Sequence, residues 1–136
     1  MIKLVKWATD QMGKPFKWGE TNCVALALAG IDAQHDTDLL DKYRKHMASE
    51  RKAWAWMERH GMDAIVLRLK DDGLVLIPAG FAQPGDIVLN THPASGVSAA
   101  VLLPGIKALS STVQHGVVIQ TATDWLLQDA IILGVR

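Results

Sequence analysis

Apolar residues recur at helical spacing in the first half of the chain and gather into short runs in the second half. Near the start, Leu4, Trp7, Ala8 and Met12 share one helical face, which predicts an amphipathic helix ended by Gly13. Because the helical patterns precede the strand patterns, we expect an α+β fold rather than one in which helices and strands alternate.

A second helix is expected to lie at the centre of the fold. Residues 23–29, Cys-Val-Ala-Leu-Ala-Leu-Ala, are apolar on every helical face, and such a helix is covered on all sides. Asn22 is a favourable N-cap, and Gly30 is a favourable residue just beyond the C-terminal end. The pattern therefore predicts a short buried helix that begins at Cys23.

Two charged surface helices are expected next. The first spans residues 36–47 with Thr37 as its N-cap, and the second begins at Ser49 and is closed by Gly61. Residues 63–70 fit either a helix or a strand, and we favour a helix.

After Gly73 the periodicity becomes that of strands. The predicted strands are 74–77, 86–89, 97–103, 106–110, 117–120 and 131–135, with a helical turn near 123–128. We expect a single domain over residues 1–136, with N-terminal helices packed on a small C-terminal antiparallel β-sheet or partly open barrel.

The composition excludes several classes of partner. Lys plus Arg and Asp plus Glu both number 14, so no broad basic surface for nucleic acid or anionic lipid is expected. The single cysteine excludes an internal disulfide. No apolar run approaches the roughly 18 residues of a membrane span, and the N-terminus lacks a signal-peptide pattern. We expect a protein made in a cytoplasm, without cofactor or metal, that binds neither nucleic acid nor membrane.

Cys23 is the main candidate for chemistry. Unpaired N–H groups and the positive end of the dipole at a helix N-terminus stabilise a thiolate, the form in which cysteine attacks a substrate. A cysteine that precedes an apolar run is also explained as a small buried hydrophobic residue. The position alone favours the structural explanation.

The surroundings of Cys23 resemble a known family. Phe-Lys-Trp-Gly at 16–19, followed after three residues by Cys23, is similar to the nucleophile motif of the NlpC/P60 cysteine hydrolases, with Asn22 where that family has Asp. Gln-Pro-Gly-Asp-Ile-Val-Leu at 83–89 resembles the element that begins the family's first barrel strand. The order and spacing are closest to small phage-encoded relatives, which also end in a short strand such as 131–136. This resemblance implies a papain-like fold.

The same resemblance leaves the catalytic base in question. In the family a histidine begins the second barrel strand, but the matching stretch 95–102 contains none. His115, at the start of a later strand, and His92, in the preceding loop, are the candidates to replace it, although each is also explained as a solvated loop residue.

We expect Trp18 and Asn22 to contact a substrate, and Asp86 to shape a turn. The other tryptophans considered, Trp7, Trp54 and Trp56, are expected to pack within the fold.

Two functions follow from the resemblance. The first is a phage tail or tail-tip protein with a degenerate hydrolase fold, which works through other tail proteins in the virion or in the host cytoplasm during assembly. The alternative is an active cysteine peptidase that cleaves peptide bonds in peptidoglycan, with Cys23 as nucleophile and His115 or His92 as base. Backbone N–H groups at the helix start would then supply the oxyanion hole.

Overall fold

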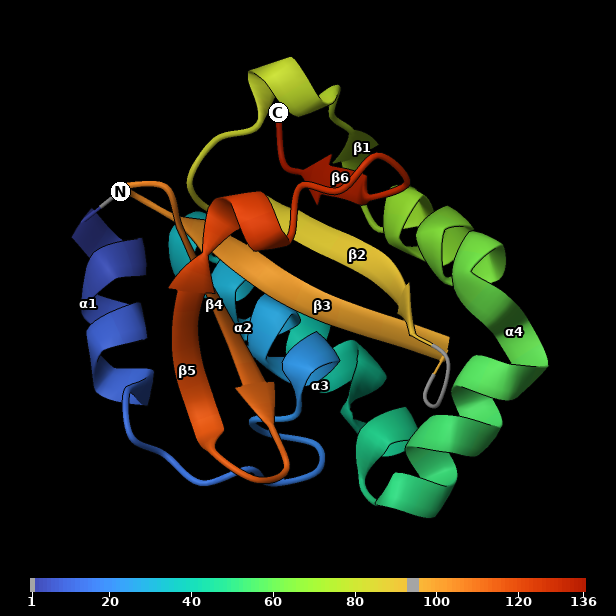
Figure 1. Ribbon diagram of the computed structural model, residues 1–136. Helices are drawn as coiled ribbons and strands as arrows, with labels where there is room; N and C mark the ends of the chain where they lie inside the picture. The colour runs from blue at the N-terminus through green and yellow to red at the C-terminus, as the bar shows by residue number, and fades with distance from the viewer. Residues whose placement is uncertain (1, 93–95) are drawn as a thin grey trace.

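The helices lie in the first half of the chain and the strands in the second, as Figure 1 shows. The computed structural model describes residues 2–92 and 96–136. The helical elements are α1 (Ile2–Gln11), α2 (Cys23–His35), α3 (Leu39–Tyr43), α4 (Glu50–Asp71) and the 3₁₀ turns η1 (Arg44–Met47), η2 (Ala79–Phe81) and η3 (Ala122–Asp124). The strands are β1 (Val75–Leu76), β2 (Ile87–His92), β3 (Gly96–Leu103), β4 (Lys107–Thr112), β5 (Gly116–Thr121) and β6 (Ile131–Gly134).

The strands form one open antiparallel sheet in the order β1-β6-β2-β3-β4-β5. The C-terminal strand β6 returns to pair with both β1 and β2, so the sheet ends in β1 on one side and β5 on the other. In the pairing of β2 with β3, Ile87 lies opposite Val101. The expected α+β class with an antiparallel sheet is confirmed.

Apolar side chains cover both faces of the sheet. Along β3, Val97, Ala99 and Val101 belong to the core shared with the helices, because alternate residues of a strand point to the same face. Ala100 and Leu102 point to the other face, where a smaller cluster includes the partly buried Trp125 and Leu126 from the segment after β5. The sheet is therefore a middle layer with its larger core on the helical side.

Helix α2 is central, as its sequence predicts, but it is longer than expected. Gly30 lies inside the helix rather than beyond its end, and the helix terminates at Asp36 in the left-handed conformation (φ 56°). A Cβ atom on Gly30 would lie 3.0 Å from Val101 Cγ2 and 3.2 Å from Trp7 Cζ3. The glycine thus permits close packing of α1, α2 and β3.

The predicted cap of the next helix is wrong. Thr37 does not cap it; the Asp32 carboxylate, near the end of α2, accepts hydrogen bonds from the backbone N–H groups of Leu39 (2.8 Å) and Leu40 (2.9 Å). Thr37 donates its hydroxyl to the same carboxylate. The two carboxylate oxygens of Asp32 thus satisfy two N–H groups at the start of α3, and Thr37 acts there as a donor to the same carboxylate.

Helix α4 joins the two helices predicted on either side of Gly61. Ser49 caps its start by accepting a hydrogen bond from the Lys52 N–H (3.2 Å). At Gly61 the backbone leaves the helical region (φ 71°, ψ 172°), and the chain continues as helix to Asp71. No helix among the described residues is long and apolar enough to cross a membrane.

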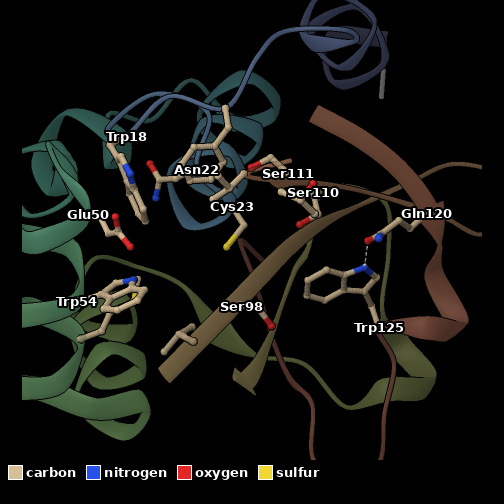
Figure 2. A pocket seen from close by; sticks show the side chains of 15 residues that line it. Trp18, Asn22, Cys23, Glu50, Trp54, Ser98, Ser110, Ser111, Gln120 and Trp125 are labelled. Carbon is tan, nitrogen blue, oxygen red and sulfur yellow. Dashed lines mark hydrogen bonds between the residues drawn. The ribbon is translucent and has the colours of Figure 1, made fainter. Parts of the chain in front are cut away.

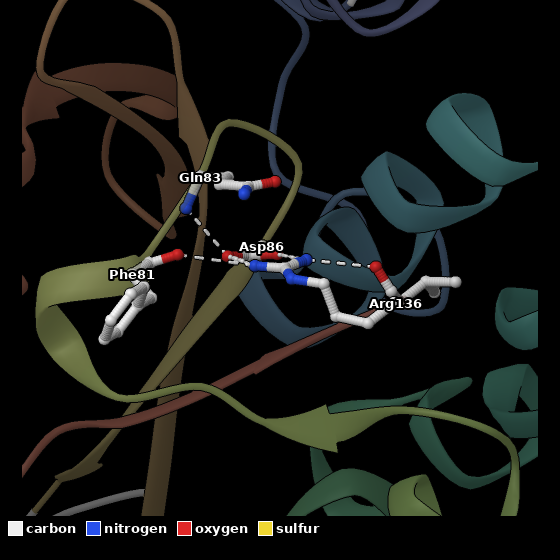
Figure 3. A network of polar contacts seen from close by, with 5 residues as sticks. Phe81, Gln83, Asp86 and Arg136 are labelled. Atoms are coloured by element: carbon white, nitrogen blue, oxygen red, sulfur yellow. Dashed lines mark hydrogen bonds and ion pairs between the residues drawn. The ribbon is translucent and has the colours of Figure 1, made fainter.

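Asp86 has the structural role expected of it. Its side chain is buried, accepts a hydrogen bond from the Gln83 N–H (2.8 Å) and forms a two-pronged pair with the Arg136 guanidinium (2.9 and 2.7 Å; Figure 3). Arg136 also donates to the Phe81 carbonyl (3.5 Å). The pair ties the chain after β6 to the turn before β2.

Candidate functional site

A cavity opens where two neighbouring strands separate. β3 and β4 pair only between Val101–Leu103 and Lys107–Leu109, although both strands continue beyond this region. The cavity at the separation has a volume of about 430 Å³, and Cys23, the first residue of α2, lies on its wall (Figure 2). We call this cavity the Cys23 cleft.

Where β3 and β4 no longer pair, hydrogen bonds from side chains take the place of backbone hydrogen bonds between the two strands. The Ser110 hydroxyl donates to the Ala99 carbonyl (2.8 Å), and the Ala99 N–H is hydrogen-bonded to the Cys23 sulfur. The Ser111 hydroxyl donates to the Thr21 carbonyl, which fastens β4 to the loop before α2. Since buried backbone groups need partners, these side chains allow the strands to stay apart.

The lining of the Cys23 cleft is mainly apolar and aromatic. The apolar residues are Phe16, Trp18, Trp54, Met57, Val97, Val113 and Trp125. The polar residues, apart from Cys23, are Asn22, Glu50, Ser98, Ser110, Ser111, Thr112 and Gln120. An apolar cavity with a few polar groups is typical of a binding site.

The Cys23 thiol is half-buried and held by backbone donors. Burial raises the pKa of the thiol above its usual range, although the N–H groups of Ala99, Val24 and Cys23 itself favour the thiolate and act in the opposite direction. Since burial has the largest effect, the pKa of the thiol lies above its ordinary value. A nucleophilic cysteine needs the opposite shift.

Only one of the two histidine candidates, His115, has a described side chain. His115 lies on the exposed turn between β4 and β5, where its backbone N–H donates to Thr112 Oγ1 (3.0 Å), and it does not line the cleft. His92 ends β2 with its backbone opposite Gly96, and its side chain lies outside the described residues. Ser98 of β3 lines the cleft within the stretch where the resembling family has its histidine. The described lining contains no imidazole.

The two residues expected to contact a substrate both line the cleft. Trp18 packs edge-on against Phe16, with ring centroids 4.9 Å apart. Asn22 is only 2% exposed, and its amide is already engaged: Oδ1 accepts from the Gly19 N–H (2.8 Å) and Nδ2 lies 3.5 Å from the Met47 sulfur. Asn22 therefore shapes the loop before α2, whereas Trp18 presents a surface to the cavity.

Among the lining residues that sequence reasoning did not assign to the site are Glu50, Trp125 and Trp54, which was expected to pack within the fold. Glu50 and Trp54 stand four residues apart on α4, so both project from the same side of that helix into the cleft. Trp125 reaches the cleft from the segment after β5 and donates its indole N–H to Gln120 Oε1 (2.8 Å; Figure 2). The spacing of Glu50 and Trp54 was a usable signal, but the sequence does not show which element they face.

Metal binding finds no support in the described part of the chain, residues 2–92 and 96–136. Within it no three side chains of His, Cys, Asp or Glu are grouped closely enough to hold an ion.

The state of the thiol predicts its reactivity. Folded Cys23 is expected to react with iodoacetamide more slowly at pH 7 than the same chain unfolded in urea, because a raised pKa leaves less thiolate at that pH. The rate should rise with pH over a range displaced upward from that of the unfolded chain. As the chain has one cysteine, total alkylation measured by mass spectrometry reports on Cys23 alone. Faster reaction of the folded protein at pH 6–7 would contradict the assignment.

Comparison with known proteins gives a family but no function. The family model described as "Domain of unknown function (DUF6950)" matches residues 2–126. A search of curated proteins finds no match.

Proposed function

This chain belongs to the DUF6950 family, and we propose that it is a phage tail or tail-tip assembly protein built on an NlpC/P60-like hydrolase fold whose chemistry has been lost. The motif around Cys23, the strand element at 83–89 and the C-terminal strand support the resemblance to phage-encoded relatives. The loss of chemistry is supported by one observation above the others. No imidazole lies among the described residues of the cleft, and burial raises the pKa of the thiol at the helix start.

In this proposal the Cys23 cleft serves as a binding surface for a segment of another tail protein. A cavity of about 430 Å³ has room for one or two side chains, and its aromatic walls favour a partner that buries apolar surface. Trp54 is 43% exposed and lines the cleft, so its ring offers apolar surface that a partner could bury. Contact with a partner would cover it.

The alternative is an active cysteine peptidase acting on peptidoglycan. It is favoured by the three backbone N–H groups directed at the Cys23 sulfur, an arrangement that also suits a developing negative charge. This function requires a base, and His92 or His115 would have to supply it.

Assembly in an infected host tests the first function. Deletion of the gene is expected to block formation of complete tails, whereas Cys23→Ala and Cys23→Ser should leave the particle count unchanged by electron microscopy and plaque assay. Normal tails without the protein would refute the proposed function.

Hydrolysis tests the alternative. The purified wild-type protein is expected to release no muropeptide fragments from isolated peptidoglycan, as followed by liquid chromatography. If fragments appear, Cys23→Ala, His92→Ala and His115→Ala identify the nucleophile and base. Release that depends on Cys23 and on either histidine would establish the peptidase and exclude the loss of chemistry.

A further inference from the structure

We infer that the Cys23 cleft accepts a basic side chain, the ammonium of lysine or the guanidinium of arginine, between Trp18 and Trp54 and against Glu50. This inference rests on the proposed binding role of the cleft and defines the partner segment as one that inserts a cation. The three residues lie along one wall of the cavity, and in Figure 2 the Glu50 carboxylate is seen between the two indole rings.

The charge of the cleft selects for a cation. Apart from the Cys23 thiol, Glu50 is the one acidic or basic side chain among the described lining residues. Its carboxylate forms no ion pair and no hydrogen bond with any described residue. Among its described residues the cleft therefore presents a single negative charge without an oppositely charged partner, at an exposed position beside apolar walls.

The aromatic walls favour the same ligand. The faces of indole rings carry negative electrostatic potential, and tryptophan is the best of the side chains for binding a cation over its ring. The apolar stem of a lysine or arginine would lie along Met57 and Val97, which also line the cavity. A neutral apolar side chain would gain the burial but not the attraction to Glu50 and the indoles.

Stabilisation of helix α4 by Glu50 does not by itself explain why Glu50 and Trp54 lie together in the wall of the cleft. An acidic residue in the first turn of α4 favours the helix through its dipole, but Ser49 already caps that end. Glu50 is exposed, as an acidic residue in a first helical turn usually is. Helix stabilisation alone does not explain why Glu50 lines the same cavity as Trp54, one turn later on the same side of the helix.

Small probes test the inference on the purified full chain. n-Butylammonium and n-butylguanidinium are titrated at low ionic strength while tryptophan fluorescence is recorded, with 1-butanol as the neutral control. Both cations are expected to bind more tightly than the alcohol. Glu50→Gln should weaken cation binding by about 2- to 30-fold and leave the affinity for the alcohol unchanged. Trp54→Leu removes an aromatic wall as well, so it should weaken binding of both cations more than it weakens binding of the alcohol.

Glu58→Gln is the matched control, because Glu58 is exposed on the same helix but does not line the cleft. It should bind the cations as the wild type does, and melting temperatures of all variants verify that each is folded. Equal binding of cations and alcohol, or unchanged cation binding in folded Glu50→Gln, would overturn the inference. Complete tails formed without the chain would instead refute the proposed function and leave cation binding standing.

Discussion

Arg136→Ala is expected to lower the free energy of unfolding by about 3 to 5 kcal/mol, because it leaves the buried Asp86 carboxylate without its charged partner. The loss is large because the carboxylate side chain is only 2% exposed and retains one neutral donor, the Gln83 N–H. Urea unfolding followed by circular dichroism measures the change. The double variant Asp86→Ala/Arg136→Ala should lose less than the sum of the two single variants, since it buries no lone charge.

Lys3→Ala provides the control for that experiment. Lys3 and Asp36 form a pair of similar length, 2.8 Å, but both side chains are well exposed. Exposed pairs contribute little, so this substitution should leave the urea midpoint unchanged. A loss in Arg136→Ala no larger than in Lys3→Ala would show that the Asp86 pair does not hold the two chain segments together.

Gly116→Ala is expected to have the second large effect, a loss of about 2 to 5 kcal/mol. Gly116 has φ 69°, a conformation that side-chain-bearing residues rarely adopt, and an added Cβ atom would lie 2.3 Å from the Lys14 carbonyl oxygen. The obstacle is backbone, held in place by its hydrogen bond from the Val117 N–H (3.0 Å). Relief therefore requires the N-terminal loop to move away from β5.

Gly105→Ala separates the two causes of that loss. Gly105 has a similar φ of 82°, but no atom lies within 4 Å of the position of an added Cβ. This variant should show only the conformational part, about 1 to 2 kcal/mol. Equal losses in Gly105→Ala and Gly116→Ala would mean that the contact with Lys14 contributes nothing.

Much of the fold could be predicted from the sequence because periodicity reports burial directly. The all-apolar residues 23–29 gave a central helix, and each of the six expected strands is present with small shifts of its ends. Gly30 was misinterpreted because a glycine that ends a helix and one that admits a neighbouring side chain look alike in sequence. Only the approach of Val101 and Trp7 distinguishes them.

Less of the candidate site than of the fold could be predicted from the sequence. Its position at Cys23 and the contribution of Trp18 followed from the motif, but the cleft exists because β3 and β4 separate after three pairs. That separation depends on Ser110 and Cys23 occupying backbone groups of Ala99, which no local pattern reveals. The roles of Glu50 and Trp54 likewise depend on the docking of α4 beside the loop before α2.

The separated strands also determine when the cleft can form during folding. Its walls combine Phe16 and Trp18 with Val113 and Trp125, and the bond from Ser111 to Thr21 joins residues 90 positions apart. Contacts between such distant segments form late, since the intervening chain must first be ordered. On a ribosome, the N-terminal helices would emerge long before β4 and β5, so Cys23 would remain accessible until those two strands arrive. Protection of this one thiol during synthesis is therefore a measure of the moment at which β4 is fastened to the loop before α2.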